Sequence, residues 1–166
     1  ACSVALATFM PFVVRAFTLT ERSLHLSSSS VGATSTYTVS FTAKQSASAF
    51  VIDFCSNTPL IGQVCTTPMD FSAEAAASTH PVFDDVTGAT ERVVVAGEVG
   101  ADDEIEVAIT GILNPSVDGV VYARIVTFDT KQNALDASPT SLVGNQDEGS
   151  VAVVITPTIG VSGTVL

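Results

Sequence analysis

Two cysteines, Cys55 and Cys65, enclose a short loop with a proline and a glycine in the stretch CSNTPLIGQVC. In a chain that is rich in Ser and Thr and poor in Lys, such a close pair favours a disulfide in an oxidising compartment. Zinc would need a third and fourth thiolate or a nearby histidine, which the surrounding sequence does not supply. Closing a loop of this size stabilises a fold by roughly 2–3 kcal/mol in the chain-entropy model.

Carboxylates at Asp84–Asp85 and at Asp102–Glu104 are the side chains with the type and spacing for acid–base catalysis. Two acids across a cleft can hydrolyse a glycosidic bond, so a hydrolase that uses Asp102 and Asp103 is a distant alternative. The chain has no Trp and only two Tyr to stack on a sugar ring. We therefore interpret both acid clusters as solvated loop charges or, at most, a weak Ca²⁺ site.

His25 and His80 are the two histidines, and neither lies in a zinc-binding or catalytic pattern. The chain has no nucleophile elbow and no phosphate-binding loop. The sequence therefore predicts a protein that is not an enzyme, with no cofactor and no metal site.

The sequence leaves three possible covalent modifications undecided. Cys2 either pairs between subunits or remains buried as a thiol. The many Ser and Thr residues leave O-glycosylation open. A lysine–asparagine cross-link would join Lys44 or Lys131 to one of four asparagines, Asn57, Asn114, Asn133 or Asn145.

The composition limits the partners and the size of the fold. A chain of 166 residues with 46% hydrophobic residues fits one domain with a continuous core. Its formal net charge of -11 repels phosphate backbones and anionic lipids, which excludes nucleic acid as a natural partner. The uncharged residues 1–14 fall short of the ~20 that a membrane-spanning helix needs, so we expect no membrane span.

Apolar and polar residues alternate in several segments, which is the pattern of half-buried strands. Residues 34–43 place Tyr37, Val39 and Phe41 on one face and hydroxyl side chains on the other. Residues 49–55 and 104–110 follow the same pattern. Residues 120–128 are apolar on both faces except at Arg124, which is typical of a covered strand.

Further strands are expected from their content of branched and aromatic residues, and one short helix is expected at residues 71–78. Many short strands without helical crossovers predict an all-β fold, an antiparallel β-sandwich of the Ig-like or Greek-key, pilin-like kind. We expect an N-terminal arm at residues 1–19 and a sandwich domain at residues 20–166. The further strand candidates are 11–19, 23–27, 91–96, 151–156 and 161–166.

Two blocks carry a resemblance to a known group of proteins. IDFCSNTPLIGQVCTTP and the later GILNPSVDGVVYARIVTF resemble a pattern in secreted, Ser/Thr-rich surface proteins of ultrasmall bacteria of the Patescibacteria (Saccharibacteria) kind. The resemblance covers roughly residues 30–130 and implies an exported cell-surface protein without known enzymatic chemistry. It also implies the Cys55–Cys65 disulfide and a turn-and-strand block made of Asn114, Pro115, Gly119, Tyr122 and Arg124.

Residues 3–19, SVALATFMPFVVRAFTL, are too apolar to lie free in water. Such a segment can complete the sheet of a second copy, as in donor-strand exchange, or it can be the first strand of its own domain. We expect the first arrangement, which makes the protein a secreted structural subunit of an extracellular, pilus-like filament of identical copies. The candidate donor-strand residues are Phe9, Phe12, Val14, Phe17 and Leu19.

The alternative is a monomeric cell-surface adhesin or carbohydrate-binding module. Loops at residues 57–68 and 84–90 would then recognise a host or a neighbouring cell. The shortage of aromatic residues argues against binding by sugar stacking.

Overall fold

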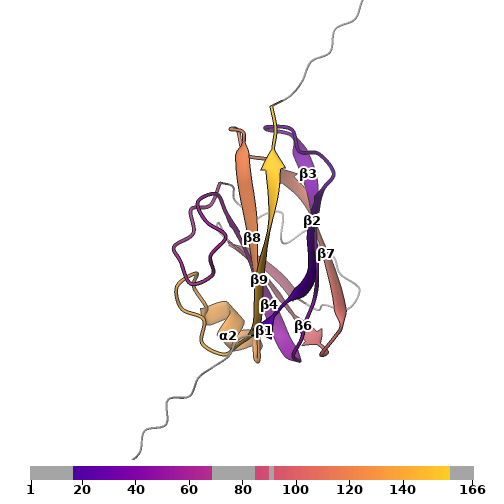
Figure 1. Ribbon diagram of the computed structural model, residues 1–166, viewed down its shortest axis with the longest axis vertical. Helices are drawn as coiled ribbons and strands as arrows, with labels where there is room; N and C mark the ends of the chain where they lie inside the picture. The colour runs from indigo at the N-terminus through magenta and orange to yellow at the C-terminus, as the bar shows by residue number, and fades with distance from the viewer. Residues whose placement is uncertain (1–16, 69–84, 90–91, 158–166) are drawn as a thin grey trace, which may run out of the picture.

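The computed structural model describes residues 17–68, 85–89 and 92–157, which form nine strands and one helix (Figure 1). The predicted helix at 71–78 and the predicted strand at 161–166 lie outside the described residues. The bounds, in chain order, are β1 Phe17–Thr18, β2 Thr20–Leu26, β3 Thr34–Thr42, β4 Ala47–Cys55, β5 Asp85–Ala89, β6 Arg92–Val99, β7 Glu104–Leu113, β8 Gly119–Phe128, α2 Lys131–Asp136 and β9 Asn145–Ile155.

The strands form two sheets, as the all-β prediction requires. A six-stranded sheet has the order β1-β9-β8-β4-β6-β5, and a three-stranded sheet has the order β2-β3-β7. Strand pairs are antiparallel, except that β1 runs parallel to β9, with Phe17 opposite Asp147 and Thr18 opposite Glu148. The first described strand therefore borders the last one.

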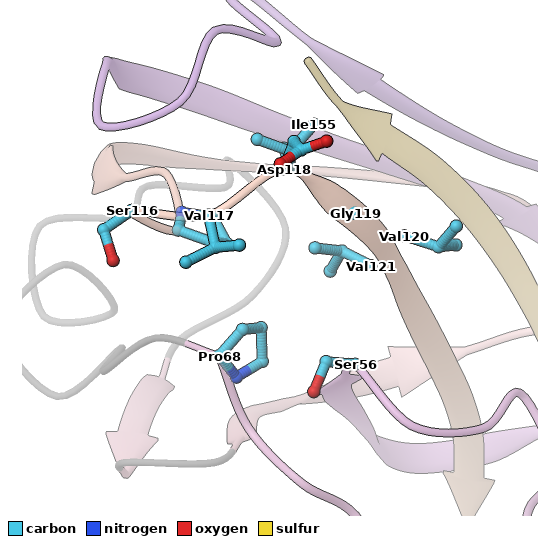
Figure 2. Close-up of a pocket in the computed structure, with 10 residues that line it drawn as sticks. Ser56, Pro68, Ser116, Val117, Asp118, Gly119, Val120, Val121 and Ile155 are labelled. Carbon is cyan, nitrogen blue, oxygen red and sulfur yellow. The ribbon is translucent and has the colours of Figure 1, made fainter. Parts of the chain in front are cut away.

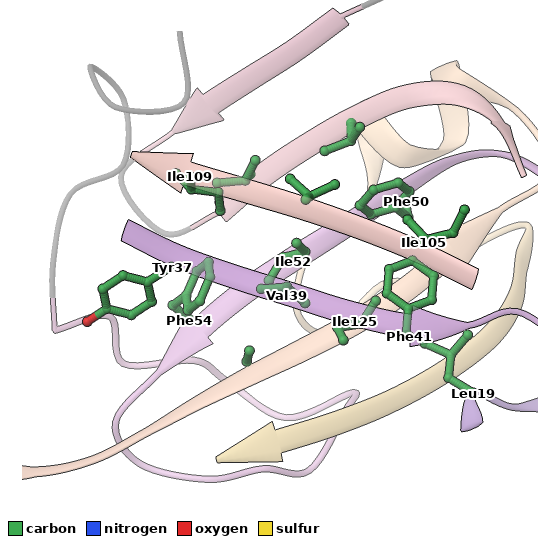
Figure 3. Close-up of a cluster of buried hydrophobic side chains, with 14 of the residues drawn as sticks. Leu19, Tyr37, Val39, Phe41, Phe50, Ile52, Phe54, Ile105, Ile109 and Ile125 are labelled. Carbon is green, nitrogen blue, oxygen red and sulfur yellow. The ribbon is translucent and has the colours of Figure 1, made fainter. Parts of the chain in front are cut away.

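One core lies between the two sheets, because alternate residues of each sheet point inward (Figure 3). Tyr37 of β3 meets Phe54 of β4 edge to face, with ring centroids 5.7 Å apart. Phe41 of β3 meets Phe50 of β4 in the same way at 5.2 Å. Each fully buried side chain of this size contributes about 1.5–3 kcal/mol, so the alternation predicted from sequence is the main source of stability.

The outer face of the six-stranded sheet is also covered. Alternate residues of β4, starting at Ala49 and Val51, point away from the main core and into a second, smaller cluster. Helix α2 and the loop after Cys55 pack over this face, which explains why β4 and β8 are apolar on both sides. The members of this cluster are Ala49, Val51, Val94, Val126, Phe128 and Ala134, with Ile61, Ala137 and Leu142 packed against them.

Beyond shifts of a few residues at the ends of β2 and β6, and the candidate strand 11–19, of which the structure describes β1 at Phe17–Thr18, three elements differ from the sequence-based expectation. Asp85–Ala89 was predicted to be a loop and is strand β5, which pairs with β6. Helix α2 was not predicted; Thr130 caps it, with its hydroxyl accepting a hydrogen bond from the Asn133 amide at 3.1 Å. Strand β9 begins at Asn145, six residues before the predicted start, because its polar first half pairs with β8.

The described chain begins and ends at opposite ends of the long axis (Figure 1). We call the end that holds Phe17 and α2 the proximal end. We call the end where β4 and β9 finish and β8 begins the distal end. Cys55, Gly119 and Ile155 mark the distal end.

Candidate functional site

The two cysteines form the predicted disulfide at the distal end. Cys55 and Cys65 are joined with their Cα atoms 5.2 Å apart. Inside the bridge, the Asn57 side chain donates to the Val64 carbonyl at 2.9 Å and accepts from the Thr66 amide at 3.0 Å. The Ser56 amide donates to the Thr66 carbonyl at 2.7 Å. The loop therefore has a defined conformation that hydrogen bonds and the disulfide maintain together.

Arg124 holds the same loop against β8. Its guanidinium donates to the Thr58 carbonyl at 2.8 and 3.0 Å and to the Gln63 carbonyl at 2.7 Å. The residue is only 2% exposed, and burial lowers the pKa of its guanidinium while the charge of Asp53 opposes that shift. The single charged residue in an apolar strand thus serves as an anchor for backbone carbonyls.

A second buried arginine forms an ion pair beside this anchor. Arg92 of β6 donates from Nε to Asp53 Oδ1 at 3.0 Å and from Nη2 to Asp53 Oδ2 at 3.1 Å. It also donates to the Ala137 carbonyl, which follows α2. No local sequence pattern predicts this pair, because the two residues are 39 positions apart. This pair ties α2 to the sheet.

The acidic residues that were candidates for catalysis have structural contacts. The carboxylate of Asp102 forms an ion pair with the Lys44 ammonium at 2.8 Å, and this hydrogen bond raises the pKa of Lys44. The carboxylate of Asp103 accepts from the Gly100 amide at 2.8 Å within the turn before β7. Glu104 starts β7 in an exposed position.

Among the described residues, no three His, Cys, Asp or Glu side chains gather as metal ligands would. His25 is exposed on β2, and His80 lies outside the described residues. Asp84 also lies outside them, while Asp85 begins β5 rather than a turn.

Asn114 organises a turn at the distal end. It is buried; its amide donates to the carbonyls of Ser28 at 2.9 Å and Ser30 at 2.8 Å, and its oxygen accepts from the Tyr37 hydroxyl at 2.9 Å. Burial raises the pKa of Tyr37 to about 12. Asn114 thus holds together segments that are distant in sequence. Its amide donates to carbonyls and does not contact Lys44, one of the candidate partners for a lysine–asparagine cross-link.

The candidate donor-strand residues fall into two groups. Phe9, Phe12 and Val14 lie outside the described residues. Phe17 is 53% exposed in β1, whereas Leu19 is fully buried in the core of its own chain. Leu19 therefore packs in the core of its own chain and is not available to a second copy. Any donor segment thus ends before β1.

We call the boundary where β2 and β9 lie next to each other the β2–β9 seam, and hydrogen bonds close it at both ends. At the proximal side, the Leu19 amide donates to the Glu148 carbonyl at 3.0 Å. At the distal side, the Thr156 amide donates to the Ser29 carbonyl at 2.8 Å. Between them the Arg22 side chain lies over Gly149, with its Cδ 2.6 Å from the place of a Cβ. An inserted strand would have to separate these contacts.

A pocket of about 390 Å³ opens at the distal end (Figure 2). Val117 and Val121 lie on one side of it, and Ser56 and Pro68 lie across from them (Figure 2). The turn before β8 contributes Asp118 to its wall. Ser56 is the first residue inside the disulfide loop and Pro68 lies shortly after it, so the disulfide also shapes this pocket.

Comparison with known proteins gives no relative for the chain. No protein-family model, no curated protein and no solved structure matches it. Among the described residues, no helix has the length and apolarity needed to cross a membrane.

Proposed function

We propose that the protein is a secreted structural subunit of an extracellular filament, a pilus-like fibre of identical copies. In this proposal the two sheets form an Ig-like β-sandwich, and the segment before β1 of one copy complements the next copy without a covalent bond. The disulfide supports a location outside the cytoplasm. The resemblance to exported bacterial surface proteins supports the same location.

The observation that carries the proposal is the difference between the two ends of the molecule. The apolar segment that precedes β1 joins the fold at the proximal end. Leu113, Val117, Val120 and Val154, at the distal end, are large apolar residues that are exposed to solvent. A donor at one end and an apolar surface at the other give a head-to-tail contact, and a contact of this type that does not close produces an open filament.

Removal of residues 1–14 tests this function. The truncated chain keeps Arg15 and Ala16, the paired strand β1 and the buried Leu19, so its fold should survive. We expect the full chain to form fibres in negative-stain images and the truncated chain to remain monomeric in size-exclusion chromatography. An unchanged thermal midpoint serves as the control for folding, and fibres of normal appearance from the truncated chain would refute the proposal.

A surface adhesin is the second candidate, and the distal pocket is the observation that favours it. Ser56, Ser116 and Asp118 supply hydroxyl and carboxylate groups that can hydrogen-bond to a sugar. Binding on a glycan array that is lost on Asp118→Ala, together with a monomeric full-length chain, would favour this function over the filament.

A further inference from the structure

We propose that the distal pocket and the apolar residues around it are the acceptor for residues 1–14 of a second copy. This inference rests on the proposed filament and assigns the surface that the donor segment occupies. We call this surface the distal patch; it consists of Pro115, Val117, Val120 and Val154 together with the pocket that Val121 and Ile155 line.

The distal patch surrounds the start of β8 and includes residues on both faces of the sheet. Val120 of β8 and Val154 of β9 are direct cross-strand partners, so their side chains lie next to each other on one face of the sheet. Val117 and Val121 face the pocket, whereas the Val120 side chain points to the other side of β8 (Figure 2). Val117 is 70% exposed and Val154 is 56% exposed. Branched apolar side chains that are grouped around a concave site mark an interaction surface.

The chemistry of the donor segment matches this surface. Residues 3–14 contain no charged side chain, so the rest of the chain carries the whole formal net charge of -11. The first charged residue of the chain, Arg15, follows the segment directly, and the pocket wall contains the exposed residue Asp118. A segment that places apolar residues in the pocket would bring Arg15 of one copy within reach of Asp118 of the other.

The direction of the chain favours a second copy over the same copy. Asp147, which is opposite Phe17, and Ile155, at the distal end, are separated by about 26 Å of extended strand. An extended segment of 14 residues spans about 46 Å and is long enough to reach either patch, so the direction of β1 decides. Because β1 runs parallel to β9, towards the distal end, the segment before it must reverse direction to reach its own distal patch. In a head-to-tail stack, the proximal end of one copy faces the distal patch of the next.

The distal patch also accepts a segment without opening the fold. Insertion beside β9 would break the hydrogen bonds at Glu148 and Thr156 and displace Arg22. Docking on the distal patch breaks no hydrogen bond between strands. The inferred contact is therefore an end-on one, with the donor in the pocket rather than in the β2–β9 seam.

Two charge substitutions provide the first experiment. Val117→Asp places a charge in the distal patch, whereas Ser23→Asp places one at an exposed position of β2, between the two ends of the molecule. We expect Val117→Asp to raise the concentration needed for fibre formation at least tenfold and Ser23→Asp to leave it within twofold. Thermal unfolding of both variants checks that each is folded, and Val154→Asp repeats the test on a strand.

Cysteine cross-linking provides the second experiment. In a chain with Cys2→Ser, the changes Phe12→Cys and Val117→Cys are made separately, and the two variants are mixed. We expect disulfide-linked dimers from the mixture under mild oxidation, and no dimers when Phe12→Cys is replaced by Thr20→Cys, an exposed position in β2.

The outcomes separate this inference from the proposed function. If truncation abolishes fibres but Val117→Asp does not and no 12–117 link forms, the filament stands and the acceptor lies elsewhere, for example along β7. If both changes placed in one chain form only an internal link, the segment binds its own copy and the inference is wrong. A glycan that occupies the pocket without affecting fibre formation would also overturn it.

Discussion

Tyr37 is the residue whose surroundings give the clearest dependence on pH. Its ring lies in the main core, and its hydroxyl donates to the buried Asn114. Because burial raises its pKa from 10.0 to about 12, the folded chain favours the neutral phenol. The corresponding stability is fully present below pH 10 and is lost as the pH rises towards 12.

Tyr37→Phe should therefore remove both the hydrogen bond and this pH dependence. At about pH 9 the variant should lose about 1–3 kcal/mol of unfolding free energy, because Asn114 keeps a buried oxygen without that donor. The difference between wild type and variant should shrink from about pH 9 to about pH 12 in urea titrations. A constant difference over this range would mean that Tyr37 does not titrate with a raised pKa.

At the scale of elements, the disulfide loop is held in two independent ways. The bridge closes it covalently, and Arg124 and Asn57 bind its backbone carbonyls. The guanidinium of Arg124 extends from β8 to the carbonyls of Thr58 and Gln63. These hydrogen bonds can therefore form without the disulfide.

The double variant Cys55→Ala/Cys65→Ala should lose about 2–3 kcal/mol of unfolding free energy while its loop stays docked. Urea unfolding measures the loss, and limited proteolysis under native conditions reports on the loop. Adding Arg124→Lys, which keeps the charge but not the planar fork, should make the loop sensitive to cleavage. Rapid cleavage within residues 56–65 of the double variant alone would show that the bridge is the main restraint.

The sequence predicted elements where alternation was long and left out those where it was short. β3 and β7 were found because their apolar residues repeat every second position, and β8 was found because it is a long run that is apolar on both faces. β5, with the sequence DVTGA, and the six residues of α2 are too short to show a period. The disulfide followed from cysteine spacing, whereas the Asp53–Arg92 pair and the distal pocket depend on which strands become neighbours, which no local pattern specifies.

For the whole molecule, the net charge opposes the assembly that the distal patch favours. Each copy carries a formal charge of -11, so like-charged copies repel one another at low ionic strength. Added salt screens this repulsion over distances of roughly 10 Å at 0.1 M and leaves apolar contacts intact.

Fibre formation should therefore become faster when NaCl is raised from about 10 mM to about 500 mM. Light scattering measures the rate, and negative-stain images identify the product as fibres rather than amorphous aggregate. Ser23→Asp should follow the same trend, since it adds one charge on β2, away from both ends of the molecule. Slower assembly at high salt would mean that attraction between opposite charges, such as Arg15 and Asp118, dominates the contact.

The parallel pairing of β1 with β9 has a mechanical consequence for a chain that is pulled from both ends. Tension applied before Phe17 and after Pro157 drives the two strands past each other in opposite directions. Their hydrogen bonds, including the one from Leu19 to Glu148, lie across that direction and are sheared together instead of being unzipped one at a time. The main resistance to extension would thus lie where Leu19 enters the core. The rest of the fold would bear little force until the hydrogen bonds between β1 and β9 break.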